Sequence, residues 1–157
     1  MYDTNGVQDG VSPVSVVPVL SSRDKWTAIS ELISLSPSLS TPHGEKIRRA
    51  VVARERINST GLGRGVAFAH GEIKGISSLL VGVGVSTHGI DFGAVDRQPV
   101  HLLFVFATPP EQRSQYLLAM ATVCRLARRK GLSPLWDGTA TLRSIESTLS
   151  PALDPLR

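Results

Sequence analysis

The sequence predicts a single α/β domain in which helices are layered on a β-sheet. Apolar residues at helical spacing alternate along the chain with short runs of β-branched residues, the order expected of layered α/β structure. The length of 157 residues suits one hydrophobic core, and no linker is long enough to separate two domains. A hydrophobic fraction of 41% and a charged fraction of 19% are typical of an ordinary globular protein.

The N-terminal segment divides into an irregular part and a short apolar part. Residues 1–13 are rich in Gly, Asp, Asn and Ser without periodicity, which predicts a flexible tail ahead of a domain spanning residues 14–157. Val14–Leu20 alternates weakly and contains Pro18, so we expect a short strand at the edge of the sheet.

Two helices are expected next. Ser22 can cap a helix that runs to about Leu35, and Thr41, an N-cap hydroxyl followed by Pro42, can start another that runs to about Glu55. Their apolar faces would contain Trp26, Ile29, Leu32 and Ile33 in the first, and Ile47, Ala50 and Val51 in the second.

Three apolar segments predict strands. A glycine-rich turn at residues 59–65 leads into a short strand, Val66–Ala69, and His70 follows where this strand ends. Leu79–Val85 and Val100–Ala107 are rich in β-branched residues and almost uniformly apolar, as expected of buried strands.

The remaining segments contain a turn and two helices. Glycine, aspartate and proline at residues 89–99 predict a turn and a return strand. Pro109 and Pro110 should end the last buried strand, and a long amphipathic helix should follow, with Gly131 just past its end. A final helix is expected at about residues 141–149.

Charge and composition argue against a nucleic-acid-binding protein. The net charge of +4 and the pI near 9.7 first suggest a nucleic-acid partner. However, the dense basic cluster lies at the end of the long helix, where cations complement the helix dipole. Aromatic residues make up only 5%, too few for a stacking platform. The basic cluster at the end of the long helix contains Arg125, Arg128, Arg129 and Lys130.

The single cysteine and the absence of long apolar runs indicate a cytoplasmic protein. Cys124 excludes an intrachain disulfide and a cysteine-rich zinc site, and this usage fits a reducing compartment. We interpret it as a small core residue. The sequence shows no signal-peptide pattern and no apolar run of bilayer length, so neither secretion nor membrane insertion is expected.

The candidate functional segment is Arg54–Gly71. Its glycines can turn several backbone N–H groups toward one anion, and Arg54, Arg56 and Arg64 add positive charge. His70 would lie at the carboxyl end of a buried strand, where ligands often bind in open α/β sheets. Because neutral imidazole has a nucleophilic nitrogen, this combination suits a group that transiently carries a phosphoryl.

Considered alone, these features are weak. A single histidine at a strand end is more often structural than nucleophilic, and the glycines match neither the dinucleotide fingerprint nor a P-loop. His43 and His88 are expected on the surface. His101 is expected to be structural, with a place in the pocket as the alternative, and Trp136 should pack the last helix against the sheet.

The same segment resembles a known active-site signature. It is similar to that of enzyme IIA components of the phosphoenolpyruvate-dependent sugar phosphotransferase system, in the fructose/mannitol class that includes nitrogen-regulatory relatives. The resemblance covers roughly residues 14–149. It is carried by Arg54-Glu55, Ser59-Thr60-Gly61-x-Gly63, Gly65-Val-Ala-Phe-x-His70-Gly71, Gly89-Ile-Asp-Phe-Gly-Ala-Val-Asp96, Pro99-Val100 and Phe104-x-Phe-Ala-x-Pro109.

This resemblance implies a mixed β-sheet flanked by helices and a role in a phosphoryl relay. Phosphorylated histidine carrier protein would donate to His70, which would pass the group to a cysteine of an enzyme IIB partner. Arg54 matches the active-site arginine, and Ser59, Thr60 and Gly61 match the polar segment that binds the phosphoryl group. No metal or organic cofactor is implied.

Two departures from the family pattern leave an alternative open. Ala69 replaces the proline that usually precedes the active histidine, so the backbone is less constrained there. Tyr116 stands where many members have a second histidine, and a tyrosine hydroxyl carries no positive charge near neutral pH. The alternative is a degenerate enzyme IIA-like module that docks partner proteins without transferring a phosphoryl group.

Overall fold

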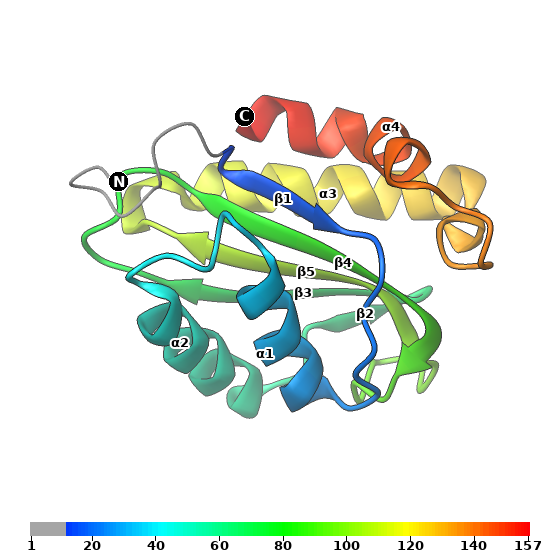
Figure 1. Ribbon diagram of the computed structural model, residues 1–157, viewed down its shortest axis with the longest axis horizontal. Helices are drawn as coiled ribbons and strands as arrows, with labels where there is room; N and C mark the ends of the chain where they lie inside the picture. The colour runs from blue at the N-terminus through cyan, green and yellow to red at the C-terminus, as the bar shows by residue number, and fades with distance from the viewer. Residues whose placement is uncertain (1–11) are drawn as a thin grey trace.

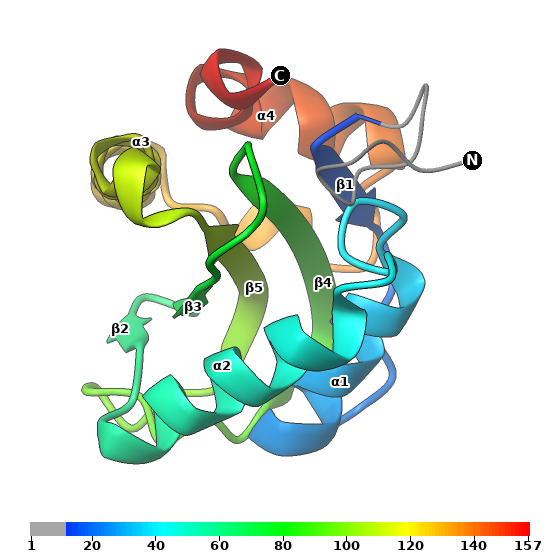
Figure 2. The same ribbon diagram turned by 90° about the vertical axis from the view of Figure 1, so that its left-hand side faces the viewer.

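The computed structural model describes residues 12–157 and contains one mixed five-stranded sheet with helices on both faces (Figures 1 and 2). This is the fold class that the sequence and the family resemblance predict. The strand order is β1-β4-β5-β3-β2; β1 pairs with β4 and β5 with β3 in parallel, whereas β4 with β5 and β3 with β2 are antiparallel. The strands are β1 (Val14–Val17), β2 (Gly61–Gly63), β3 (Val66–Glu72), β4 (Leu80–Ile90) and β5 (Val100–Thr108).

The sheet separates two hydrophobic cores. Helices α1 (Lys25–Leu35) and α2 (Gly44–Ile57) cover one face, and α3 (Arg113–Lys130) and α4 (Leu142–Leu153) cover the other, as Figure 2 shows. Since side chains of a strand alternate between faces, neighbouring residues of β3 enter different cores. Phe68 packs in the α3 and α4 core, whereas Ala67 and Ala69 pack in the core of α1 and α2.

The N-terminal boundaries of two helices differ from the prediction. α1 begins at Lys25 because the Asp24 carboxylate accepts hydrogen bonds from the N–H groups of Trp26 and Thr27, at 3.1 and 3.2 Å. Ser22 lies two residues before this cap, where its own N–H donates to Glu31 Oε1 at 3.0 Å.

The second helix also starts late. α2 begins at Gly44, with His43 in the N-cap position. The Thr41 hydroxyl accepts from the His43 N–H at 3.1 Å and so closes a turn before the helix. The predicted end at Glu55 falls two residues short of the observed end at Ile57.

The predicted return strand within residues 89–99 is wrong. β4 continues to Ile90, and among the described residues the following segment contains only an isolated bridge between Asp24 and Asp91. The Asp96 carboxylate organises the loop instead, because it accepts from the N–H groups of Arg64 and Gln98 at 2.9 and 3.1 Å.

At the N-terminus, residues 1–11 of the predicted tail lie outside the described residues. Ser12 and Pro13 belong to the domain, since the Pro13 carbonyl accepts from the Val81 N–H at 2.8 Å. β1 is a short edge strand, as predicted. Within residues 12–157, no helix combines the length and the apolar character needed to span a bilayer.

Candidate functional site

The site is built on the part of β3 that has no outer neighbour. β2 pairs with the beginning of β3, and the Phe68 N–H donates to the Thr60 carbonyl at 3.1 Å. Ala69–Glu72 remain paired with β5 on the inner side. Because backbone groups alternate between the two sides of a strand, the Phe68 carbonyl and the His70 N–H face the same outer edge.

His70 lies at this open edge. The sequence predicts a strand that ends at Ala69, but β3 continues to Glu72, so His70 lies within the strand. Its Nδ1 atom lies 3.2 Å from the Phe68 carbonyl oxygen and 3.1 Å from the Tyr116 hydroxyl. A carbonyl oxygen only accepts, so Nδ1 carries a proton in the Phe68 contact. The lone pair of the neutral ring is then on Nε2.

Burial and charge both affect the protonation of His70. Partial burial is the main cause that lowers the pKa of the imidazole below its ordinary value, and the nearby Arg54 guanidinium also lowers it. The hydrogen bond to Phe68 and the Glu55 carboxylate act in the opposite direction. Because the net shift is downward, the neutral, nucleophilic ring is favoured near neutral pH.

A pocket of about 610 Å³ surrounds the ring and extends around the open edge of β3. Its walls come from α2 on one face of the sheet and from α3 on the other. Two arginines, one from each helix, bring positive charge; Arg113 also pairs with Glu72 at 2.6 Å. The lining comprises Ala50, Ala53, Arg54, Ile57, His70, Gly71, Glu72, Thr108, Arg113, Tyr116 and Leu117.

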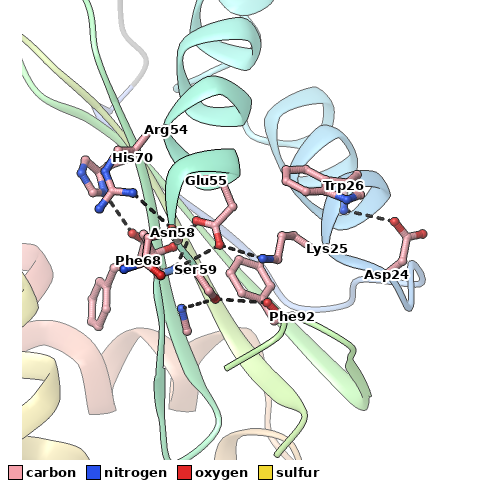
Figure 3. Close-up of polar contacts among 12 residues, drawn as sticks. Asp24, Lys25, Trp26, Arg54, Glu55, Asn58, Ser59, Phe68, His70 and Phe92 are labelled. Atoms are coloured by element: carbon pink, nitrogen blue, oxygen red, sulfur yellow. Dashed lines mark hydrogen bonds and ion pairs between the residues drawn. The ribbon is translucent and has the colours of Figure 1, made fainter. Parts of the chain in front are cut away.

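Arg54 and Tyr116 both line the pocket with His70. Arg54, in the last turn of α2, lies beside His70 in Figure 3 and donates from Nη1 to the Asn58 carbonyl at 3.1 Å. The Tyr116 ring is tilted 34° to the imidazole at a centroid distance of 4.7 Å. Burial raises the pKa of Tyr116 to about 12, so its hydroxyl stays neutral. The structure therefore brings together three of the predicted site residues.

Ser59, Thr60 and Gly61 are not among the residues that line this pocket. The Ser59 hydroxyl donates to the Phe92 carbonyl and accepts from the Gly61 N–H, both at 3.2 Å (Figure 3). The Thr60 N–H donates to Glu55 Oε1 at 3.0 Å. The N–H groups of Thr60 and Gly61 therefore already donate to oxygen atoms of Glu55 and Ser59 and are not free to bind an anion.

Other candidates also have structural surroundings. His88 is exposed and His43 is partly buried. His101 stacks on Trp136 with centroids 5.0 Å apart, and its Nδ1 lies 2.7 Å from the Ser86 carbonyl oxygen. Trp136 thus contacts His101, and Cys124 packs partly buried against the core. Within residues 12–157, no three His, Cys, Asp or Glu side chains are arranged to hold a metal ion.

Thr108 is a pocket residue that the sequence analysis missed. It ends β5 opposite Glu72, and its buried hydroxyl has no hydrogen-bond partner among the described residues. The sequence feature that could have indicated Thr108 is its position at the end of an apolar strand. However, only the pairing of β5 with β3 brings that strand end to His70.

The chain is similar to known proteins over most of its length. Residues 13–133 match the family model described as phosphoenolpyruvate-dependent sugar phosphotransferase system, EIIA 2. A nitrogen regulatory protein of Bradyrhizobium diazoefficiens is 26% identical over 144 residues, which cover 92% of this chain and 94% of the relative. These matches confirm the resemblance that the sequence motifs indicate.

Solved structures show the same fold. The nitrogen regulatory protein IIA-Ntr from Neisseria meningitidis aligns with a TM-score of 0.72 at 22% identity, covering 86% of this chain and 92% of that one. Enzyme IIA for mannitol from Escherichia coli, in a complex with phosphorylated enzyme IIB, gives a TM-score of 0.66 at 16% identity, with coverage of 87% and 94%.

Proposed function

The chain belongs to the EIIA 2 family of the phosphoenolpyruvate-dependent sugar phosphotransferase system, and we propose that it is a phosphocarrier whose acceptor is His70. Members of this family are phosphotransferase components, which supports a general role in phosphoryl transfer. The observation that carries the proposal is a partly buried, neutral imidazole whose Nδ1 proton points to the Phe68 carbonyl and whose neighbour is the Arg54 guanidinium.

In the proposed reaction, Nε2 of His70 attacks the phosphorus atom of a phosphohistidine on the donor. The N–P bond of the donor breaks as the new N–P bond forms, and the leaving electron pair returns to the donor imidazole. Arg54 balances charge on the transferred oxygens. The Phe68 carbonyl accepts a hydrogen bond from the Nδ1–H group and so stabilises the positive charge that the ring gains.

The proposed partners are phosphorylated histidine carrier protein as donor and an enzyme IIB as acceptor. A cysteine thiolate of enzyme IIB would then attack the phosphorus atom on His70, so that an S–P bond forms as the Nε2–P bond breaks and the electron pair returns to the ring, which becomes neutral again. The complex between a IIA and a phosphorylated IIB chain in a structural relative supports this partner. The nitrogen regulatory relative favours a regulatory pathway over sugar uptake.

Phosphorylation of the purified protein tests this proposal. The full chain is incubated with phosphoenolpyruvate, enzyme I and histidine carrier protein, and acid-labile phosphate is measured for the wild type, His70→Ala and His88→Ala. We expect labelling of the wild type and His88→Ala but not of His70→Ala. Labelling that persists in His70→Ala would place the acceptor elsewhere.

A second candidate function is partner docking without phosphoryl transfer. It is favoured by Tyr116, because its neutral hydroxyl contacts Nδ1 of His70 and offers no cation to a phosphoryl group. Absence of label with several cognate carriers, together with retained binding to an enzyme IIB or a regulated protein, would select this function.

A further inference from the structure

A buried ion pair lies behind the proposed site. The Glu55 side chain is 1% exposed and pairs with Lys25 Nζ at 3.0 Å, which joins α2 to α1 (Figure 3). Lys25 also lies 4.8 Å from the centre of the Phe92 ring. The carboxylate accepts two further hydrogen bonds, from the Thr60 N–H at 3.0 Å and from the Thr60 hydroxyl at 2.5 Å. Each oxygen of this buried charge therefore has a partner.

These contacts form the beginning of a continuous chain that ends on the imidazole. Thr60 donates to Glu55 through its N–H and hydroxyl, while its carbonyl accepts from the Phe68 N–H at 3.1 Å. The Phe68 carbonyl is in turn the partner of Nδ1 of His70 at 3.2 Å. Figure 3 shows Glu55, Phe68 and His70 in one region at the end of α2.

The same network also controls the position of Arg54. Arg54 and Glu55 are consecutive residues in the last turns of α2, so fixing the Glu55 carboxylate fixes the backbone that carries the guanidinium. Arg54 then donates to the Asn58 carbonyl, two residues before Thr60. The segment from Asn58 to Thr60 thus links both groups that would contact the phosphoryl group.

We propose that Glu55 and Thr60 are positioning residues for phosphoryl transfer, with Lys25 as the counter-ion that holds Glu55 in place. This inference rests on the proposed function. It also gives Thr60 a role other than direct phosphoryl binding. Since phosphoryl transfer depends on the alignment of nucleophile and charge, a small shift of His70 or Arg54 slows the reaction.

The test uses two substitutions at Thr60 and one matched control. Thr60→Val keeps the N–H bond to Glu55 and removes the hydroxyl bond, whereas Thr60→Ser keeps both. The control is Ser38→Ala, which removes another buried hydroxyl, one that donates to the Val81 carbonyl at 2.8 Å away from the pocket. All three variants are first compared by urea unfolding, so that transfer is measured on folded protein.

The transfer experiment separates alignment from docking. Single-turnover transfer from phosphorylated histidine carrier protein gives the rate within the complex, and titration gives the dissociation constant. We expect Thr60→Val to slow the bound step by roughly tenfold or more with an unchanged dissociation constant. Thr60→Ser and Ser38→Ala should keep the wild-type rate. A Thr60→Val rate equal to that of Ser38→Ala would overturn the proposal.

A measurement on the free protein distinguishes failure of this inference from failure of the proposed function. The 15N chemical shifts of the His70 ring report which nitrogen carries the proton. We expect the Nδ1–H form in the wild type and Thr60→Ser, and a shift toward the Nε2–H form in Thr60→Val. If this shift occurs but neither the wild type nor any variant accepts phosphate, the phosphocarrier function is refuted, although Thr60 still orients the imidazole. An unchanged ring in Thr60→Val refutes the positioning role.

Discussion

Two hollows of similar size lie at opposite ends of the central strands. The pocket around His70 measures about 610 Å³, and the other, lined by Arg23, His88 and Arg97, measures about 680 Å³. Each therefore contains a histidine and two arginines. They differ in how the histidine is held, because His70 is partly buried between a carbonyl and a tyrosine hydroxyl, whereas His88 is exposed.

This difference shows that residue types and volume do not define a site. The His88 ring makes no hydrogen bond within the described part of the chain, so neither its tautomer nor its direction is fixed by a partner. Phosphoryl transfer requires an oriented nucleophile. The first hollow supplies that orientation through the open edge of β3, and substitutions in the two hollows can test the contrast.

The largest effect on phosphoryl transfer is expected from replacing the arginine beside His70. Arg54→Gln removes the charge beside His70, and we expect transfer to slow by roughly 100-fold, because a lost donor to a transferring group costs that much in other sites. Arg97→Gln, the matched change in the second hollow, should leave transfer unchanged. Single-turnover phosphorylation measures both, and equal losses would contradict the distinction between the hollows.

Two glycines provide the next comparison. A Cβ atom on Gly71 would lie 2.9 Å from the Val51 backbone nitrogen, so Gly71→Ala must push α2 away from β3. We expect a loss of about 1–3 kcal/mol in the free energy of unfolding. Gly93, in the second hollow, has a φ of +66° and open surroundings, with only Lys25 Nζ at 3.9 Å. Gly93→Ala should cost about 1 kcal/mol from backbone strain alone, and urea unfolding should rank the two.

The Tyr116 hydroxyl should contribute less. Tyr116→Phe keeps the ring packed on His70 and removes the hydroxyl, which contacts His70 Nδ1 and donates weakly to Met120 Sδ. A hydrogen bond to a neutral partner is worth about 0.5–1.5 kcal/mol. We expect the transfer rate to change by less than about tenfold. A loss as large as that of Arg54→Gln would show that the hydroxyl contacts the transferred group directly.

The smallest expected effect concerns pH and stability. Because burial lowers the pKa of His70 in the folded state, the unfolded chain binds the proton more readily. The contribution of His70 to stability is thus complete above the ordinary histidine pKa and is lost as the pH falls through the lower, folded value. Urea unfolding between pH 7.5 and 5 should show a weaker decline for His70→Gln than for the wild type.

The elements with strong apolar patterns were predictable from sequence. Val100–Ala107 corresponds to β5 within one residue, because a strand buried on both faces is apolar throughout. The helix that ends at Gly131 is confirmed as α3. The start of α1 was missed because Ser22 and Asp24 are both residue types that cap helices, and the structure uses the Asp24 side chain.

The candidate site was predictable only in part. Signature motifs place His70, Arg54 and Tyr116 in one pocket, and the structure agrees on their proximity. The motifs do not reveal that Thr60 turns toward Glu55, because this depends on the position of Lys25 in another helix. Thr108 reaches the pocket only through strand pairing, which local sequence does not specify.

The position of the pocket between α2 and α3 has a mechanical consequence for the whole domain. These helices rest on separate cores, divided by the sheet. The binding of any partner that contacts both α2 and α3 therefore depends on the packing of both cores. Mutations in either core, even those remote from the imidazole, would therefore change the geometry of the same pocket at the edge of the sheet.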